Sequence, residues 1–145
     1  MISPQDYWNG RDLTNVDELT PEIRTNADIT MAKVSELLDR ANAGADHFVT
    51  SGWRSRAGNA ATPGASATSK HLSGQAVDIS DADRYLADWC AANLDVLEEI
   101  GLWCEDFRYT PRWVHFQIVP PKSGKRIFIP SMAKPADPDF PVSWI

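Results

Sequence analysis

Cysteine is scarce in this sequence of 145 residues, which contains only Cys90 and Cys104. Neither belongs to a CxxC pair, and this spacing excludes a zinc knuckle or a dithiol redox motif. A domain of this length buries a stable core without disulfides, so we expect both thiols to act as small buried hydrophobic groups. A Cys90–Cys104 disulfide is the alternative.

Long apolar runs and a leader segment are also missing. No stretch approaches the roughly 20 apolar residues that a membrane-spanning helix needs, so we expect no membrane insertion. Residues 1–6 lack the basic and apolar regions of a signal peptide. We therefore expect a chain made in the cytoplasm, and one that acts outside the membrane only if something else releases it.

Excess positive charge is absent as well, because 14 Lys and Arg face 20 Asp and Glu, a net charge of −6. Nucleic-acid binding requires a basic surface, so this class of function is excluded. Apolar residues make up 43% and charged residues 23% of the chain, which is the composition of an ordinary globular protein. We expect one monomeric domain over residues 1–145.

Hydrophobic periodicity predicts an α+β domain with two main helices and several short strands. Residues 20–22, Thr-Pro-Glu, form a helix start. Residues 1–19 are interpreted as a polar arm, residues 52–70 as a long functional loop, and residues 130–145 as a proline-rich tail. The helices are expected at about 21–41 and 82–98, the second capped by Asp81 or Asp83, and the strands at 47–51, 75–80, 102–104, 113–119 and 126–129.

Histidine is rare, and two of the three histidines stand in unusual places. His47 is interpreted as an ordinary histidine at the end of a strand. His71 ends the long loop, whereas Asp78 and His115 each lie inside an apolar strand, where a polar side chain needs a partner. Gly74 allows a sharp turn that returns His71 toward Asp78.

Two imidazoles and a carboxylate that converge form a ligand set of catalytic zinc, with a fourth position left for water. If the strands of Asp78 and His115 are neighbours, this arrangement follows. The alternative from spacing alone is a hydrogen-bonded His–Asp network without metal.

The segment from residue 69 to 78 has the pattern Ser69-x-His71-x-x-Gly74-x-Ala76-x-Asp78. Together with Trp113-Val114-His115 downstream and Ser51-Gly52-Trp53-Arg54-Ser55 upstream, it resembles the M15 group of zinc peptidases over residues 20–130. This group includes D-Ala-D-Ala carboxypeptidases and dipeptidases, and phage L-alanyl-D-glutamate endolysins.

The resemblance implies an antiparallel sheet that carries one zinc ion, held by His71, Asp78 and His115. It also implies that Arg54 holds the substrate's carbonyl or carboxylate group, and that Ser69 lies just behind the metal ligands. A guanidinium near the metal can also stabilise an oxyanion; the alternative for Arg54 is a surface ion pair. Trp53 and Trp113 flank the site residues, and each is expected either to line the cleft or to pack in the core.

One position departs from the family pattern. Many members carry a Glu or Asp as general base three residues before the last histidine ligand, where this chain has Arg112. A hairpin would bring Glu105 or Asp106 beside His115, and we favour Glu105 as the base, then Asp106. An external group, or no base at all, is the remaining alternative.

The resemblance implies zinc-dependent hydrolysis of a peptide bond in bacterial peptidoglycan, and we expect an endolysin-like stem-peptide endopeptidase that reaches the cell wall after phage-mediated release. D-Ala-D-Ala carboxypeptidase activity is the close alternative. Because Arg112 replaces the usual base, a non-catalytic zinc module that binds the wall or belongs to a virion is a second hypothesis. A domain without metal is the third.

Overall fold

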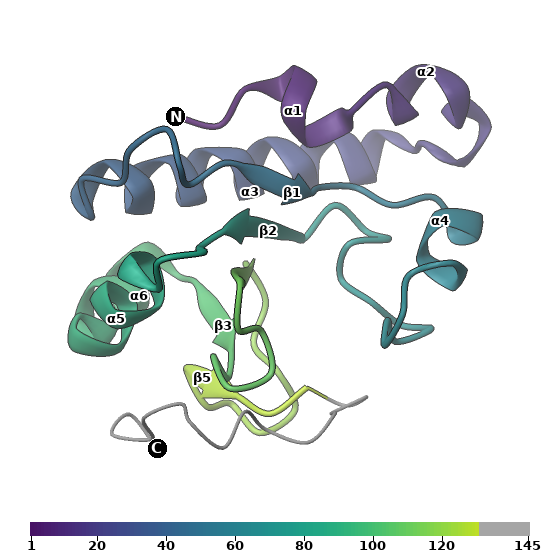
Figure 1. Ribbon diagram of the computed structural model, residues 1–145. Coiled ribbons are helices and arrows are strands. Elements are labelled where there is room, and N and C mark those ends of the chain that lie inside the picture. Colours follow the sequence, from purple (N-terminus) through teal and green to yellow (C-terminus); the bar gives the residue numbers. More distant parts are fainter. Residues whose placement is uncertain (131–145) are drawn as a thin grey trace.

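The computed structural model describes residues 1–130, which form a five-stranded sheet with helices packed around it (Figure 1). The strand order is β1-β2-β4-β3-β5, and every neighbouring pair is antiparallel except the parallel pair of β3 and β5. The α+β class and the largely antiparallel sheet are therefore confirmed. The strands are β1 (Val49–Ser51), β2 (Ala76–Ser80), β3 (Trp103–Glu105), β4 (Trp113–Gln117) and β5 (Ile127–Phe128).

The longest helix, α3 (Pro21–Arg40), begins as the sequence predicts. The Thr20 hydroxyl accepts the N–H of Ile23 at 3.1 Å, and Pro21 occupies the first turn, where its missing N–H costs nothing. One face of α3 packs across β2 (Figure 1). The helix contributes to the core the buried side chains of Ala27, Met31, Val34, Leu37 and Leu38.

Strand β2 is buried along its whole length and carries two different faces. Val77 and Ile79 belong to the hydrophobic core. Because side chains alternate along a strand, Asp78 between them points to the opposite face. The strand thus anchors the core with one side and presents a carboxylate on the other.

The segment before α3 is helical, which corrects the prediction of a polar arm. It contains α1 (Pro4–Trp8), α2 (Arg11–Thr14) and the 3-10 helix η1 (Val16–Glu18). Tyr7 is fully buried, its hydroxyl donates to the Ala76 carbonyl at 3.3 Å, and Trp8 packs against Trp53. Helices this short have no readable period, so tertiary packing of the aromatic side chains determines them.

The predicted helix at 82–98 is two helices, α5 (Tyr85–Ala92) and α6 (Leu94–Ile100). Asn93 between them has φ −131° and ψ 47°, which is not a helical conformation. Arg84 takes the N-cap position of α5, but both predicted carboxylates bind its first turn: Asp81 accepts the N–H groups of Leu86 and Ala87, and Asp83 accepts that of Tyr85. The long loop also contains a short helix, α4 (Arg56–Ala60), which Ser55 caps.

Both cysteines are buried free thiols, as expected. Cys90 lies in α5 and Cys104 in β3. Over residues 1–130, no helix combines the length and the apolar character needed to cross a membrane. The predicted tail lies outside the described residues, apart from Pro130.

Candidate metal centre

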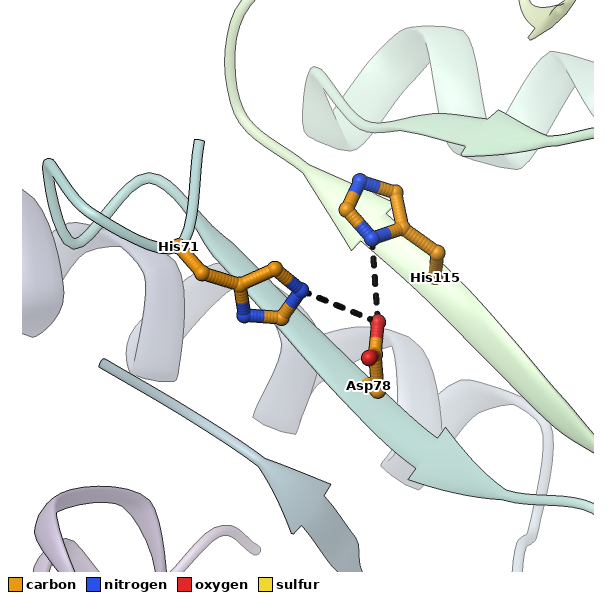
Figure 2. Close-up of side chains that lie close together, drawn as sticks. All are labelled: His71, Asp78 and His115. Carbon is orange, nitrogen blue, oxygen red and sulfur yellow. Dashed lines mark hydrogen bonds and ion pairs between the residues drawn. The ribbon is translucent and has the colours of Figure 1, made fainter. Parts of the chain in front are cut away.

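Three predicted ligands meet at one point of the sheet, as Figure 2 shows. The Nε2 atom of His71 lies 3.2 Å from Oδ1 of Asp78, and Nδ1 of His115 lies 2.9 Å from the same oxygen. All three residues are buried, at 2%, 7% and 6% exposure. Their potential ligand atoms lie within 4.8 Å of one another, the spacing of a metal-binding group.

Strand pairing and one glycine turn produce this convergence. In the ladder between β2 and β4, Asp78 is the direct partner of His115. Gly74 has φ +74°, a conformation that glycine adopts without strain, and it returns the chain from His71 into β2. A Cβ at Gly74 would come within 2.7 Å of the Ile23 carbonyl oxygen, so the close packing of α3 also requires glycine there.

The outward nitrogen of each histidine is bound to a carbonyl oxygen. Nδ1 of His71 lies 2.8 Å from the Gly52 carbonyl, and Nε2 of His115 lies 2.9 Å from Oε1 of Gln117. The amide nitrogen of Gln117 donates to the Val119 carbonyl, which leaves its oxygen to face His115. Since carbonyl oxygens only accept, both outward nitrogens carry hydrogen.

The inward nitrogens of neutral His71 and His115 are therefore lone-pair acceptors, and they face a carboxylate oxygen that is also an acceptor. Three acceptors this close need a proton or a cation between them. Outward N–H groups held by carbonyls are also what orients metal-binding histidines in proteins. The donor set of two imidazoles and one carboxylate therefore fits zinc.

The electrostatics of this cluster favour positive charge. Burial alone would raise the pKa of the Asp78 carboxyl, but His71 and His115 beside it hold that pKa well below its usual range. Burial likewise disfavours the charged form of His115, yet the carboxylates of Glu105 and Asp78 raise its pKa to about 9.

Arg54 lies beside the cluster and is fixed by three contacts. Its guanidinium lies 3.3 Å from Oδ2 of Asp78, and it donates to the Ser51 hydroxyl at 2.9 Å and to the Asn59 side chain at 3.4 Å. Burial lowers the pKa of Arg54, while the Asp78 and Glu105 carboxylates oppose this effect. The side chain thus presents a fixed cation to the same space as the three ligands.

The two candidate bases have different surroundings. Pairing of β3 with β4 joins Trp103 to Gln117 and Cys104 to Phe116, and the same register brings Glu105 opposite His115. The Glu105 carboxylate lies 3.9 Å from Nδ1 of His115. Asp106, in contrast, is buried and accepts two hydrogen bonds from the Arg108 guanidinium.

A cleft of about 540 Å³, a volume typical of ligand pockets, is lined by the three candidate ligands. Its lining, taken over residues 1–130, includes Arg54, Ser69, Glu105 and Trp113 but neither Asp106 nor Trp53. The Ser69 hydroxyl accepts the backbone N–H of His71 at 3.2 Å.

Trp53 packs in the core, only 1% exposed, and its indole N–H donates to the Leu72 carbonyl. Each tryptophan was expected either at the cleft or in the core. Trp113 lines the cleft, and Trp53 packs in the core.

Sequence reasoning missed three groups that support the site: the Gly52 carbonyl, Asn59 and Gln117. Only Gln117 had a usable signal. It lies two residues after His115 on the same strand, and residues i and i+2 share a face. A backbone carbonyl and an asparagine in a loop give no pattern that a sequence can show.

Comparison with known proteins gives one match. No curated protein and no solved structure matches the chain. The profile of the Peptidase M15 family matches residues 13–115, which include the three ligands, Arg54 and Glu105. The match covers more than two thirds of the sequence, so the chain belongs to the Peptidase M15 family and is a peptidase.

Proposed function

We propose that this peptidase holds one zinc ion with His71, Asp78 and His115 and hydrolyses a peptide bond of bacterial peptidoglycan. The observation that carries the proposal is the set of three acceptors at the base of an open cleft, two of them imidazoles oriented by carbonyl oxygens. When bound, zinc lowers the pKa of a coordinated water to about 7 and polarises the substrate's carbonyl group.

Glu105 is our proposed general base. Glu105 lines the cleft and its carboxylate lies near His115, which supports a role in taking a proton from the attacking water and returning it to the leaving amine. Arg112 occupies the usual position of the base in the sequence, and Glu105 supplies the missing carboxylate from the neighbouring strand.

Arg54 is our proposed oxyanion-stabilising group. Its guanidinium is partly engaged by Asp78 and lines the cleft, where a substrate oxygen can approach it. A fixed cation at this place stabilises the negative charge that develops on the carbonyl oxygen.

Within this chemistry, we favour endopeptidase cleavage of the stem peptide, in an endolysin-like role on the cell wall. D-Ala-D-Ala carboxypeptidase activity is the alternative. The presence of Arg112 where the family usually has its general base favours a non-catalytic zinc module. The proximity of Glu105 to His115 argues instead for an enzyme.

The test is incubation of the zinc-loaded protein with purified peptidoglycan, followed by mass spectrometry of the released material. An endopeptidase exposes a new amino group inside the stem peptide, whereas a carboxypeptidase releases only free D-alanine. A chelator should abolish either product, and added zinc should restore it. Intact peptidoglycan after incubation with fully zinc-loaded protein would contradict the proposal.

A further inference from the structure

The cleft contains two cations that the proposed chemistry does not use. Lys70 and Lys122 both line it, and both residues are exposed. The other charged side chains of the lining are Arg54, Asp78 and Glu105. The cleft therefore has more cationic than anionic side chains, although the chain as a whole carries a net charge of −6.

The other three charged side chains of the lining each lie close to an oppositely charged or histidine side chain. Arg54 pairs with Asp78, and Glu105 lies beside His115. Among the described residues, no carboxylate forms an ion pair with Lys70 or Lys122. Within residues 1–130, neither ammonium group therefore stabilises the fold through an ion pair.

The two lysines come from different segments of the cleft wall. Lys70 directly precedes the ligand His71, at the end of the loop that leads into β2. Lys122 lies in the connection from β4 to β5, immediately after Pro120 and Pro121, whose rings fix their φ angles. Ser69 and Ser123, the sequence neighbours of the two lysines, line the same cleft.

We propose that Lys70 and Lys122 bind a free carboxylate of the peptide substrate and so make the enzyme selective for anionic peptides. The inference rests on the proposed function for the substrate being a peptide. An unpaired ammonium group attracts a carboxylate over roughly one Debye length, which is about 10 Å at an ionic strength of 0.1 M.

The test uses two synthetic stem-peptide analogues that differ at one carboxyl group beside the scissile bond, free in one and amidated in the other. Exposed ion pairs contribute about 0.2–1 kcal/mol each, so each Lys→Gln substitution should reduce kcat/KM for the free acid about 1.4–5-fold. The double variant Lys70→Gln/Lys122→Gln should lose about 10-fold. The loss should appear in KM with kcat unchanged, because the carboxylate is bound equally in the ground and transition states.

Matched variants separate charge from local structure. Lys125 is exposed and belongs to the same connection as Lys122, but it does not line the cleft. Lys125→Gln should therefore leave kcat/KM for both peptides unchanged. Lys70→Arg/Lys122→Arg keeps both charges and should retain most of the preference for the free acid. That preference should also shrink as ionic strength rises.

Equal losses for the two peptides, or no loss in the double variant, would overturn the inference while leaving the proposed function intact. If the zinc-loaded wild type cleaves neither peptide, the proposed function fails, and calorimetric binding of the same two peptides decides the inference alone. Tighter, lysine-dependent binding of the free acid supports it, and equal binding overturns it.

Discussion

Two groups of side chains in the described part of the chain have the spacing of a metal site. Only one of these groups also has the hydrogen-bond partners that orient histidines toward a metal. His71, Asp78 and His115 form the first group, and His47, Asp81 and Asp83 form the second. In both, the potential ligand atoms lie within 4.8 Å of one another. The difference lies in what else these atoms do.

In the second group, the carboxylates already serve the helix that follows. The two oxygens of Asp81 each accept a backbone N–H of α5 at 2.8 Å, and Asp83 accepts another. Nδ1 of His47 lies 3.0 Å from the Ser80 carbonyl, and Nε2 is 3.8 Å from the exposed Asp83. The group starts a helix and holds a strand end, which is a structural role.

In the first group, the partners of His71 and His115 are arranged so that their free nitrogens converge. Proximity of histidine and carboxylate is therefore a weak criterion by itself. The direction of the lone pairs, which the outer hydrogen bonds determine, separates a ligand set from a helix cap. The predictions below test this difference, ordered by the size of the expected effect on the metal site.

The largest effect is expected from removal of a ligand. His71→Ala should eliminate zinc binding and activity, and the loss of affinity should exceed the roughly 100-fold that substitutions of outer partners cost. His47→Ala is the matched control, because it removes the histidine of the other group. Metal analysis after dialysis should find one zinc per chain in wild type and His47→Ala, and none in His71→Ala. Zinc retained by His71→Ala, or lost from His47→Ala, would reverse the assignment.

A large kinetic effect without metal loss is expected at Glu105. Glu105→Gln removes the proton acceptor but keeps the shape of the side chain, so kcat should fall about 10²–10⁴-fold with zinc content unchanged. Asp106→Asn is the control, since Asp106 pairs with Arg108 and does not line the cleft. It should lower the melting temperature and change kcat only a few-fold. A greater loss of kcat in Asp106→Asn than in Glu105→Gln would contradict our choice of base.

A moderate effect is expected at Gln117, which orients His115 from behind. Gln117→Ala should weaken zinc binding about 10–100-fold, because the imidazole loses the acceptor that fixes its orientation. Gln117→Glu keeps an acceptor oxygen at that place and should retain affinity close to wild type. Competition against a chromogenic chelator measures both constants. Unchanged affinity in Gln117→Ala would mean that strand packing alone orients the ring.

No effect on zinc is expected at Asp81, although it belongs to a group with metal-site spacing. Asp81→Ala leaves two backbone N–H groups at the start of α5 without their acceptor, and should reduce the free energy of unfolding by about 1–3 kcal/mol. Urea denaturation checks the stability and metal analysis the zinc content. Loss of zinc without loss of stability would indicate that the second group binds metal after all.

Two of the three proposed ligands were predictable because they stand where a polar side chain needs a partner. Asp78 and His115 interrupt apolar strands, whereas His71 ends a loop and was indicated by the pattern shared with the M15 group. Long α3 was predictable from its cap and period. These features depend on residues that are close together in the sequence, so a sequence pattern can predict them.

Other features depend on contacts between distant segments. α1 is held by Tyr7 and Trp8 against residues far along the chain, and the break at Asn93 interrupts a pattern that is apolar on both sides. The Gly52 carbonyl that orients His71 has no side chain to indicate its role. Such features appear only when the fold brings the segments together.

Gly52 has a further consequence for where the working unit of this protein begins. A Cβ at Gly52 would lie 2.1 Å from the Tyr7 carbonyl oxygen, so the backbone that holds His71 rests directly on α1. At the other end, Gln117 lies beyond residue 115, where the family match stops. A chain trimmed to the matched residues 13–115 would keep every proposed zinc ligand and lose a support behind each of the two histidines. We therefore expect full-affinity zinc binding at the proposed site to require residues on both sides of the matched range 13–115.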